Sequence, residues 1–244
     1  MNATIDPEPL PRIVAGADGC RAGWVIACQN LASNKIGWDV VPCLRDFLHR
    51  PAVPVVLAID IPIGLPERGS RECDLEARRM LKRPRSSSVF PAPIRSLLAA
   101  ESYREASARR FRLEGKRVSI QSWNIVPKVR EVDLLLLENA ALRSIIRESH
   151  PELCFFAMAG GSAMVHAKKS PAGRRERELL LRRQFGDSVG DALADRTRLK
   201  CAADDILDAF SVLWTARRIH KGEAVTVPRN PGVDACGLPM EIVV

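Results

Sequence analysis

Residues 55–66 read V-V-L-A-I-D-I-P-I-G-L-P. An apolar, β-branched run of this length, ended by proline and glycine, predicts a buried strand that stops at a turn. Asp60 stands at that junction, and α/β proteins usually place their chemistry at the ends of central strands. The alternative is that Asp60 only caps the turn that follows. Asp60 is therefore the first candidate for a functional acid.

The segments before Asp60 predict the other strands of the same sheet. One apolar run, R-I-V-A-G-A-D, ends at Asp18, a second leaves from Trp24, and a third covers residues 36–41. Short turns between these runs predict an antiparallel meander. A short helix over residues 43–49 then leads to the strand that ends at Asp60. The resulting order, β-β-β-α-β, predicts an α/β fold with a mixed sheet flanked by helices.

The remainder of the chain is mainly helical in pattern. Helices are expected over residues 71–82, 94–113, 120–142 (kinked or restarted at Pro127), 151–158, 174–185 and 202–220, a strand within 144–149, a polar linker over 187–197 and one or two short strands at the end. Residues 1–11, acidic and proline-rich, are expected to be a disordered tail and not a signal peptide. Residues 12–244 are expected to form a single domain, in which about 71–142 is a basic, mainly helical insertion.

Composition restricts the class of protein. Hydrophobic residues make up 46% and charged residues 27% of the 244 residues, as in soluble globular proteins. No apolar stretch approaches the roughly 20 residues that span a bilayer, so no membrane partner is expected. The seven cysteines include no C-x-x-C pair, which argues against a disulfide framework and a structural zinc site. Reduced thiols in a cytoplasmic protein are the simplest interpretation.

The net charge of +8 is unevenly distributed. Fourteen lysines and arginines lie between Arg78 and Arg130, against three acids, Glu101, Glu105 and Glu114. Such a local excess favours a polyanionic partner, with nucleic acid, either DNA or RNA, as the first candidate. The alternative is a solvated basic surface without a partner. Aromatic residues are scarce, which gives little support to a base-stacking platform for single strands.

A second acidic motif lies in the last predicted helix, which reads A-D-D-I-L-D-A-F-S-V-L-W from Ala203. Asp205 and Asp208 fall on one face, about 60° apart at the helical spacing of about 100° per residue. Acids beside apolar neighbours need a compensating positive charge, and Mg²⁺ or Mn²⁺ would supply it. Together with Asp18 and Asp60 they could surround two ions, an arrangement that supports phosphodiester hydrolysis. The alternative is that these acids face solvent or cap the helix.

Several motifs together resemble one known family. They are G-A-D-G-C-R-A-G-W, A-I-D-I-P-I-G-L-P, S-S-V-F-P, Q-S-W-N-I-V-P-K-V-R-E-V-D, H-P-E, a lysine pair and D-D-I-L-D-A-F, from about residue 12 to the end. The chain resembles the DUF429 family, described as predicted nucleases of the ribonuclease H-like superfamily. The resemblance implies a ribonuclease H-like sheet, with Asp18 as the first-strand metal ligand and Asp60 as the fourth-strand acid. It also implies that Asp205 and Asp208 are terminal-helix acids and makes Glu152 a further candidate.

The leading hypothesis is a metal-dependent nuclease that cleaves phosphodiesters through this carboxylate cluster. Asp18, Asp60 and Asp208 are the expected ligands of Mg²⁺ or Mn²⁺, with Asp205 or Glu152 completing the catalytic set. The expected substrate-binding residues are Arg21, Arg85, Ser87, Ser88, Gln121, Lys128, Lys168 and Lys169. His150 is either a proton shuttle or a structural histidine. The alternatives are a nucleotide-binding phosphotransferase or ATPase-like protein of the same superfamily, and a non-catalytic nucleic-acid binder.

Overall fold

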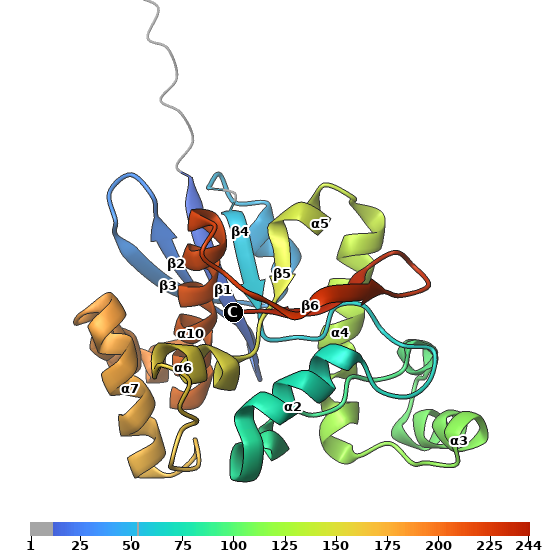
Figure 1. The fold of residues 1–244 in the computed structure, drawn as a ribbon. Coiled ribbons are helices and arrows are strands. Elements are labelled where there is room, and N and C mark those ends of the chain that lie inside the picture. Colours follow the sequence, from blue (N-terminus) through green and yellow to red (C-terminus); the bar gives the residue numbers. More distant parts are fainter. Residues whose placement is uncertain (1–11, 53) are drawn as a thin grey trace, which may run out of the picture.

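The computed structural model describes residues 12–52 and 54–244, and the predicted tail over residues 1–11 lies outside them. Within the described residues, a five-stranded mixed sheet has the order β3-β2-β1-β4-β5 (Figure 1). Its strands are β1 (Ile13–Cys20), β2 (Gly23–Asn30), β3 (Ile36–Val41), β4 (Pro54–Ile59) and β5 (Ile146–Glu148). The first three pair antiparallel, whereas β4 is parallel to β1 and β5 is parallel to β4. The predicted α/β class and the antiparallel meander are confirmed.

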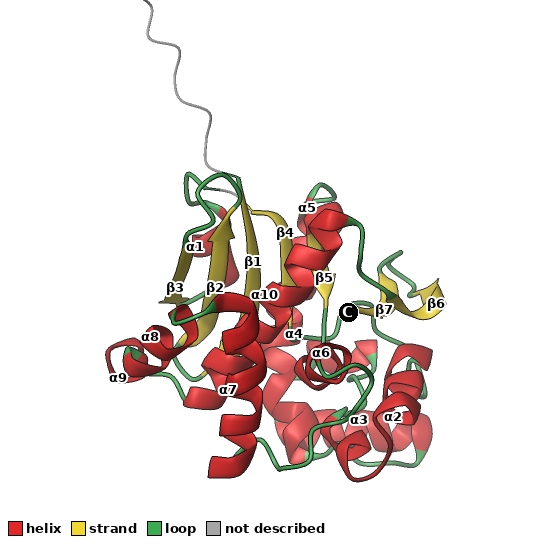
Figure 2. Cartoon of the chain, turned by 60° about the vertical axis from the view of Figure 1, so that its left-hand side comes forward, coloured by secondary structure: helices red, strands yellow, loops and turns green. Residues whose placement is uncertain are grey.

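Helices surround this sheet (Figure 2). They are α1 (Leu44–Leu48), α2 (Glu72–Arg85), η1 (Ser86–Ser88), η2 (Arg95–Ala99), α3 (Tyr103–Glu114), α4 (Ile120–Glu138), α5 (Leu142–Ile145), α6 (Pro151–Met158), α7 (Pro171–Phe185), α8 (Ser188–Ala194), α9 (Arg196–Leu199) and α10 (Ala203–Lys221). Strands β6 (Thr226–Val233) and β7 (Pro239–Val243) pair antiparallel in a separate hairpin. Among the described helices, none is long and apolar enough to cross a membrane.

Helix α10 packs along β1, β2 and β4 on one face of the sheet. Gly16 permits this close approach, because a Cβ at that position would collide with the backbone of α10 at Ala209 and Leu213. Val14 and Val56 point to the same side and share one core with α10. The tight packing fixes the side chains of α10 relative to the two central strands.

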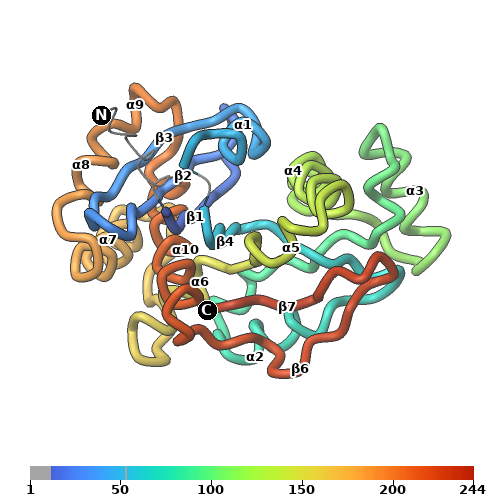
Figure 3. Tube along the Cα trace, turned by 90° about the horizontal axis from the view of Figure 1, so that it is seen from above, coloured from blue at the N-terminus to red at the C-terminus, as the bar shows by residue number. Residues whose placement is uncertain are grey.

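The opposite face of the sheet is covered mainly by α1 and α4. Ala15 and Ala17 of β1, and Leu57 of β4, share a second core with Val129 and Val132 of α4. Seen from above, α7, α8 and α9 lie beside β1–β3, and α2, α3 and the β6–β7 hairpin lie on the other side of the molecule (Figure 3). The central strands are therefore covered on both faces, and only their ends reach the surface.

Three of the predicted helical and linker segments differ from the structure. The helix expected over 94–113 is divided into η2 and α3, because Ser102 accepts the N–H of Glu105 at 3.2 Å and so caps a new helix. The linker expected over 187–197 forms α8 and α9, because Val189 and Ala192 are buried against the core beside α10. Helix α4 ends at Glu138 and is one element with Pro127 inside it, so no restart occurs there.

Candidate active site

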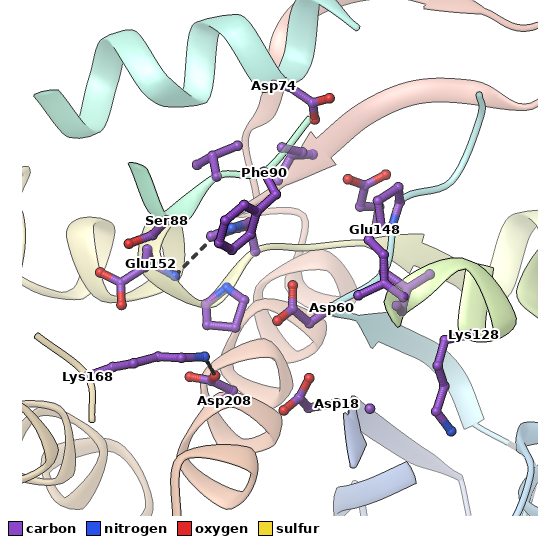
Figure 4. Close-up of a pocket in the computed structure, with 18 of the residues that line it drawn as sticks. Asp18, Asp60, Asp74, Ser88, Phe90, Lys128, Glu148, Glu152, Lys168 and Asp208 are labelled. Carbon is purple, nitrogen blue, oxygen red and sulfur yellow. Dashed lines mark hydrogen bonds and ion pairs between the residues drawn. The ribbon is translucent and has the colours of Figure 1, made fainter. Parts of the chain in front are cut away.

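A cavity of about 730 Å³ opens where the carboxyl ends of β1 and β4 meet α10. The segment between α2 and η2, helix α4, the start of α6 and the segment before α7 supply its other walls. Figure 4 shows side chains from these separate elements directed into the same space. Parallel strands place their carboxyl ends at one edge of the sheet, and this is where α/β proteins bind ligands.

Asp18, Asp60 and Asp208 form the acidic side of this cavity (Figure 4). Asp18 lies opposite Val25 within β1, which continues to Cys20 and does not end at Asp18 as predicted. The N–H of Asp60 donates to the carbonyl of Ala17 at 3.0 Å, so this residue extends the pairing of β4 with β1. Helix α10 adds Asp208 from its second turn. We call these three acids the carboxylate trio.

The negative charge of the carboxylate trio is poorly compensated. Within the described residues, Lys168 is the one cation in ion-pair contact with the trio, 2.7 Å from Asp208 Oδ2. The buried Asp208 Oδ1 has no hydrogen-bond partner there. Burial, followed by repulsion from Asp60 and Asp208, raises the pKa of Asp18 well above its usual value. Burial also raises the pKa of Asp60, to about 6, and that of Asp208, against the opposing effect of nearby positive charge.

Glu152 and Asp205 differ in their relation to the cavity. Glu152 lines it from α6, with Oε1 accepting from Arg177 Nε at 3.1 Å and Oε2 buried without a partner among the described residues. Asp205 is not among the lining residues, because its carboxylate accepts the N–H of Ala202 at 2.9 Å and caps the start of α10. The structure therefore places Glu152 in the lining of the cavity. Asp205 lies outside the lining, near enough for its charge to add, after burial and the charges of the other two acids of the trio, to the raised pKa of Asp18.

His150 follows β5 and is the N-cap residue of α6. Its Nδ1 accepts the N–H of Glu152 at 3.2 Å, while its ring lines the cavity. Burial raises the pKa of Asp60, and positive charge on the His150 ring would partly oppose this increase. The capping bond gives His150 a structural role and leaves Nε2 without a hydrogen bond to the described residues.

Most of the predicted phosphate-binding side chains surround the same cavity. Arg85, Ser87, Ser88, Lys128, Lys168 and Lys169 all line it. Arg21, in the turn between β1 and β2, and Gln121, in the first turn of α4, are exposed and outside its lining. Basic and hydroxyl side chains therefore border the carboxylate trio from three separate segments of the chain.

Sequence reasoning missed a buried ion network at the back of the cavity. Arg71 donates to Asp74 Oδ1 at 2.6 Å and to both carboxylate oxygens of Glu148, at 2.6 and 2.7 Å. Asp74 Oδ2 also accepts the N–H of Ala92, and Glu148 Oε2 accepts that of Ile63. The Arg71–Asp74 spacing is visible in the sequence, whereas no sequence pattern pairs Arg71 with Glu148. This network, called the Arg71 network below, holds the loops after β4 and η1 in place.

The carboxylate trio suits a hard divalent cation in donor type and in charge. Carboxylate oxygens are the ligands that Mg²⁺ prefers. The pKa values of Asp18 and Asp60 are raised first by burial and then by repulsion from neighbouring acids, and a bound cation would oppose both effects. Within residues 12–52 and 54–244, no three histidine, cysteine or acidic side chains are already assembled closely enough to hold an ion.

One comparison with known proteins gives a match. A family model described as "Protein of unknown function (DUF429)" matches residues 16–232, a range that contains all three acids of the carboxylate trio. No curated protein and no solved structure matches the chain significantly. Because the match covers most of the sequence, the chain belongs to the DUF429 family.

Proposed function

We propose that this protein is a metal-dependent phosphodiester hydrolase that acts on nucleic acid. The observation that carries the proposal is the carboxylate trio, whose three acids share one ion pair among the described residues, on one side of a cavity bordered by lysine, arginine and serine side chains. Acids with free oxygens would hold cations, and the surrounding cations and hydroxyls would bind phosphate. A site with both features suits an anionic ester that needs a Lewis acid.

The arrangement of elements supports a relation to ribonuclease H-like proteins. The order β-β-β-α-β, an antiparallel meander joined to parallel strands, and a late helix packed on β1 are the features that this relation predicts. The acids also occupy the expected elements: Asp18 in β1, Asp60 after β4 and Asp208 in α10. We therefore propose this superfamily for the fold as well.

The side chains divide into two roles. Asp18, Asp60 and Asp208 would hold Mg²⁺ or Mn²⁺, with Glu152 Oε2 as a further acceptor. The metal, when bound, supplies Lewis acidity and activates water for attack on phosphorus. Lys168, Lys169 and Arg85 would bind the non-bridging phosphate oxygens, and the hydroxyls of Ser87 and Ser88 would donate to the same group. These contacts orient the ester and carry no base information.

The direct test is Asp60→Asn, assayed with Mn²⁺ on single-stranded, duplex, hybrid and branched substrates. We expect a folded protein whose cleavage rate falls by at least about 100-fold, because a functional carboxylate is lost. Asp46→Asn is the matched control, since Asp46 is exposed on α1 and outside the cavity. Cleavage by the Asp60 variant at the wild-type rate would refute the proposal.

The two alternatives give different results in related experiments. A phosphotransferase or ATPase-like protein would be stabilised against heat by ATP, and a metal-dependent hydrolase by Mn²⁺ without nucleotide. A non-catalytic binder would hold nucleic acid in a salt-sensitive manner that Asp60→Asn does not weaken. The carboxylate trio favours the hydrolase over the binder, because simple phosphate binding gives no reason to collect acids beside the basic side chains.

A further inference from the structure

Phe90 is an exposed aromatic side chain inside the cavity. It is 52% exposed and lines the same cavity as the carboxylate trio. Figure 4 shows its ring projecting into the cavity. An apolar ring left in water loses the stabilisation that burial would give it. Its position beside the acids suggests that a ligand covers it.

The exposure of Phe90 does not come from a loosely attached loop. Val89 and Ala92 on either side are almost fully buried, and the N–H of Ala92 donates to Asp74 of the Arg71 network at 3.1 Å. The backbone on both sides of the ring is therefore anchored to the core. An exposed ring on an anchored backbone is a contact surface whose main chain is already ordered, which reduces the entropy lost when a ligand binds.

The size of the cavity restricts what can lie against the ring. A volume of about 730 Å³ falls in the range of about 300–1,000 Å³ typical of sites that enclose small ligands. A phosphate held by Lys168 and Lys169 would place the attached nucleoside in this space. A base still paired and stacked within a duplex cannot present its face to a side chain, so enzymes that act on enclosed bases take them out of the stack.

We propose that Phe90 stacks on an unpaired nucleobase beside the cleaved linkage. The preferred substrate is then a single strand, or an end or junction that frees one nucleotide, and not a continuous duplex. This inference rests on the proposed function, whose site it describes in more detail. Stacking tolerates any base, because each base has a π face. The site would therefore distinguish unpaired from paired nucleotides more strongly than one base from another.

The test compares thymidine 5′-monophosphate with deoxyribose 5-phosphate, which lacks the base. Binding is measured by calorimetry on the wild type, because neither compound contains a phosphodiester that the proposed reaction could cleave. We expect the nucleotide to bind roughly tenfold more tightly than the sugar phosphate, as one base–aromatic stack gives. Phe90→Ala should abolish this preference and Phe90→Trp should retain it. Phe111→Ala is the matched control, because Phe111 is 54% exposed on α3 and outside the cavity.

Equal binding of the two compounds, or an unchanged preference in Phe90→Ala, would overturn the inference. A cleavage assay on single-stranded and duplex oligonucleotides separates this failure from failure of the proposed function. Loss of cleavage in Asp60→Asn without any base preference would leave the hydrolase standing and remove the stacking role. A Phe90-dependent base preference without any cleavage would support the nucleotide subsite and contradict the hydrolase.

Discussion

Two groups of buried or partly buried acids lie at the same end of the sheet, and they differ in how far nearby cations and N–H groups balance their negative charge. In the Arg71 network, Arg71 holds Asp74 and Glu148 through one guanidinium. In the carboxylate trio, Lys168 contacts Asp208 alone, and no ion pair within the described residues reaches Asp18 or Asp60. Acids of both groups line the same cavity, so their position in the fold does not explain why, among the described residues, every acid of one group forms an ion pair and only Asp208 of the other does.

The difference separates structural acids from candidate functional ones. Each carboxylate oxygen of Asp74 and Glu148 accepts a hydrogen bond from Arg71 or from a backbone N–H. By contrast, Asp208 Oδ1 is buried without a partner among the described residues. A buried carboxylate oxygen without a hydrogen-bond donor destabilises the fold, and proteins keep such a loss of stability mainly at functional sites. The trio therefore fits a ligand site, and the Arg71 network fits a scaffold.

Removing the cation from the Arg71 network should have the largest effect on stability. Arg71→Met leaves Asp74 and Glu148 buried without their partner, and we expect unfolding free energy to fall by about 3–5 kcal/mol in urea titrations. The exposed pair of Arg79 with Glu72 is the matched control, and Arg79→Met should cost about 0–1 kcal/mol. Equal losses of unfolding free energy in Arg71→Met and Arg79→Met would show that the Arg71 network stabilises the fold no more than an exposed ion pair does.

Removing an acid from the trio should change stability in the opposite direction. Folding raises the pKa of Asp60 from 3.8 to about 6, so its protonated form stabilises the protein below about pH 4 and this stability is lost as pH rises through 6. Asp60→Asn should therefore gain stability relative to wild type between pH 4 and 7, on the order of 2 kcal/mol given the partial exposure of Asp60. Urea titrations across this range test the sign, and a constant difference would contradict it.

A smaller effect on stability is expected from the ion pair between Lys168 and Asp208 of the trio. Lys168→Met should lower unfolding free energy by about 1–2 kcal/mol at neutral pH, less than for a fully buried pair because the lysine side chain is 43% exposed. In the Asp208→Asn background the same substitution should have almost no effect, and a double-mutant cycle measures this coupling. Additive effects would show that Lys168 does not compensate Asp208.

The smallest effect should come from the rim of the cavity. Lys169→Gln should weaken nucleic-acid binding for all sequences alike and reduce the slope of log affinity against log salt by about one. Lys35→Gln, in the exposed turn between β2 and β3, should leave the slope unchanged. Equal slopes for the two variants would place the bound phosphates elsewhere on the protein.

The sequence indicated that Asp18, Asp60 and Asp208 lie near one another. It did not show that Asp205 lies outside the lining of their cavity, and the reason is physical. Asp60 follows an apolar run that only a buried strand explains, and Asp208 lies inside a long helix with apolar neighbours. Asp205 shares the helical spacing, yet it lies in the first turn, where the N–H of Ala202 captures its carboxylate. Periodicity identifies a shared face, and it does not show which acid a free backbone donor will bind.

The Arg71 network and Phe90 could not be predicted in this way. Arg71 and Glu148 are separated by 77 positions, and tertiary packing alone brings them together. Phe90 stands between a serine run and two prolines, a context that indicates a loop and says nothing about the direction of the ring. The division of 94–113 was visible in Ser102 and Glu105, whose spacing is typical of a helix start.

Equilibrium binding of Mn²⁺ to the wild type, Asp60→Asn and Asp46→Asn tests the central claim most directly. The carboxylate trio predicts saturable binding to the wild type and to Asp46→Asn, with affinity reduced at least about tenfold in Asp60→Asn because one carboxylate ligand is lost. The same Mn²⁺ affinity in all three proteins would show that the trio does not bind the metal.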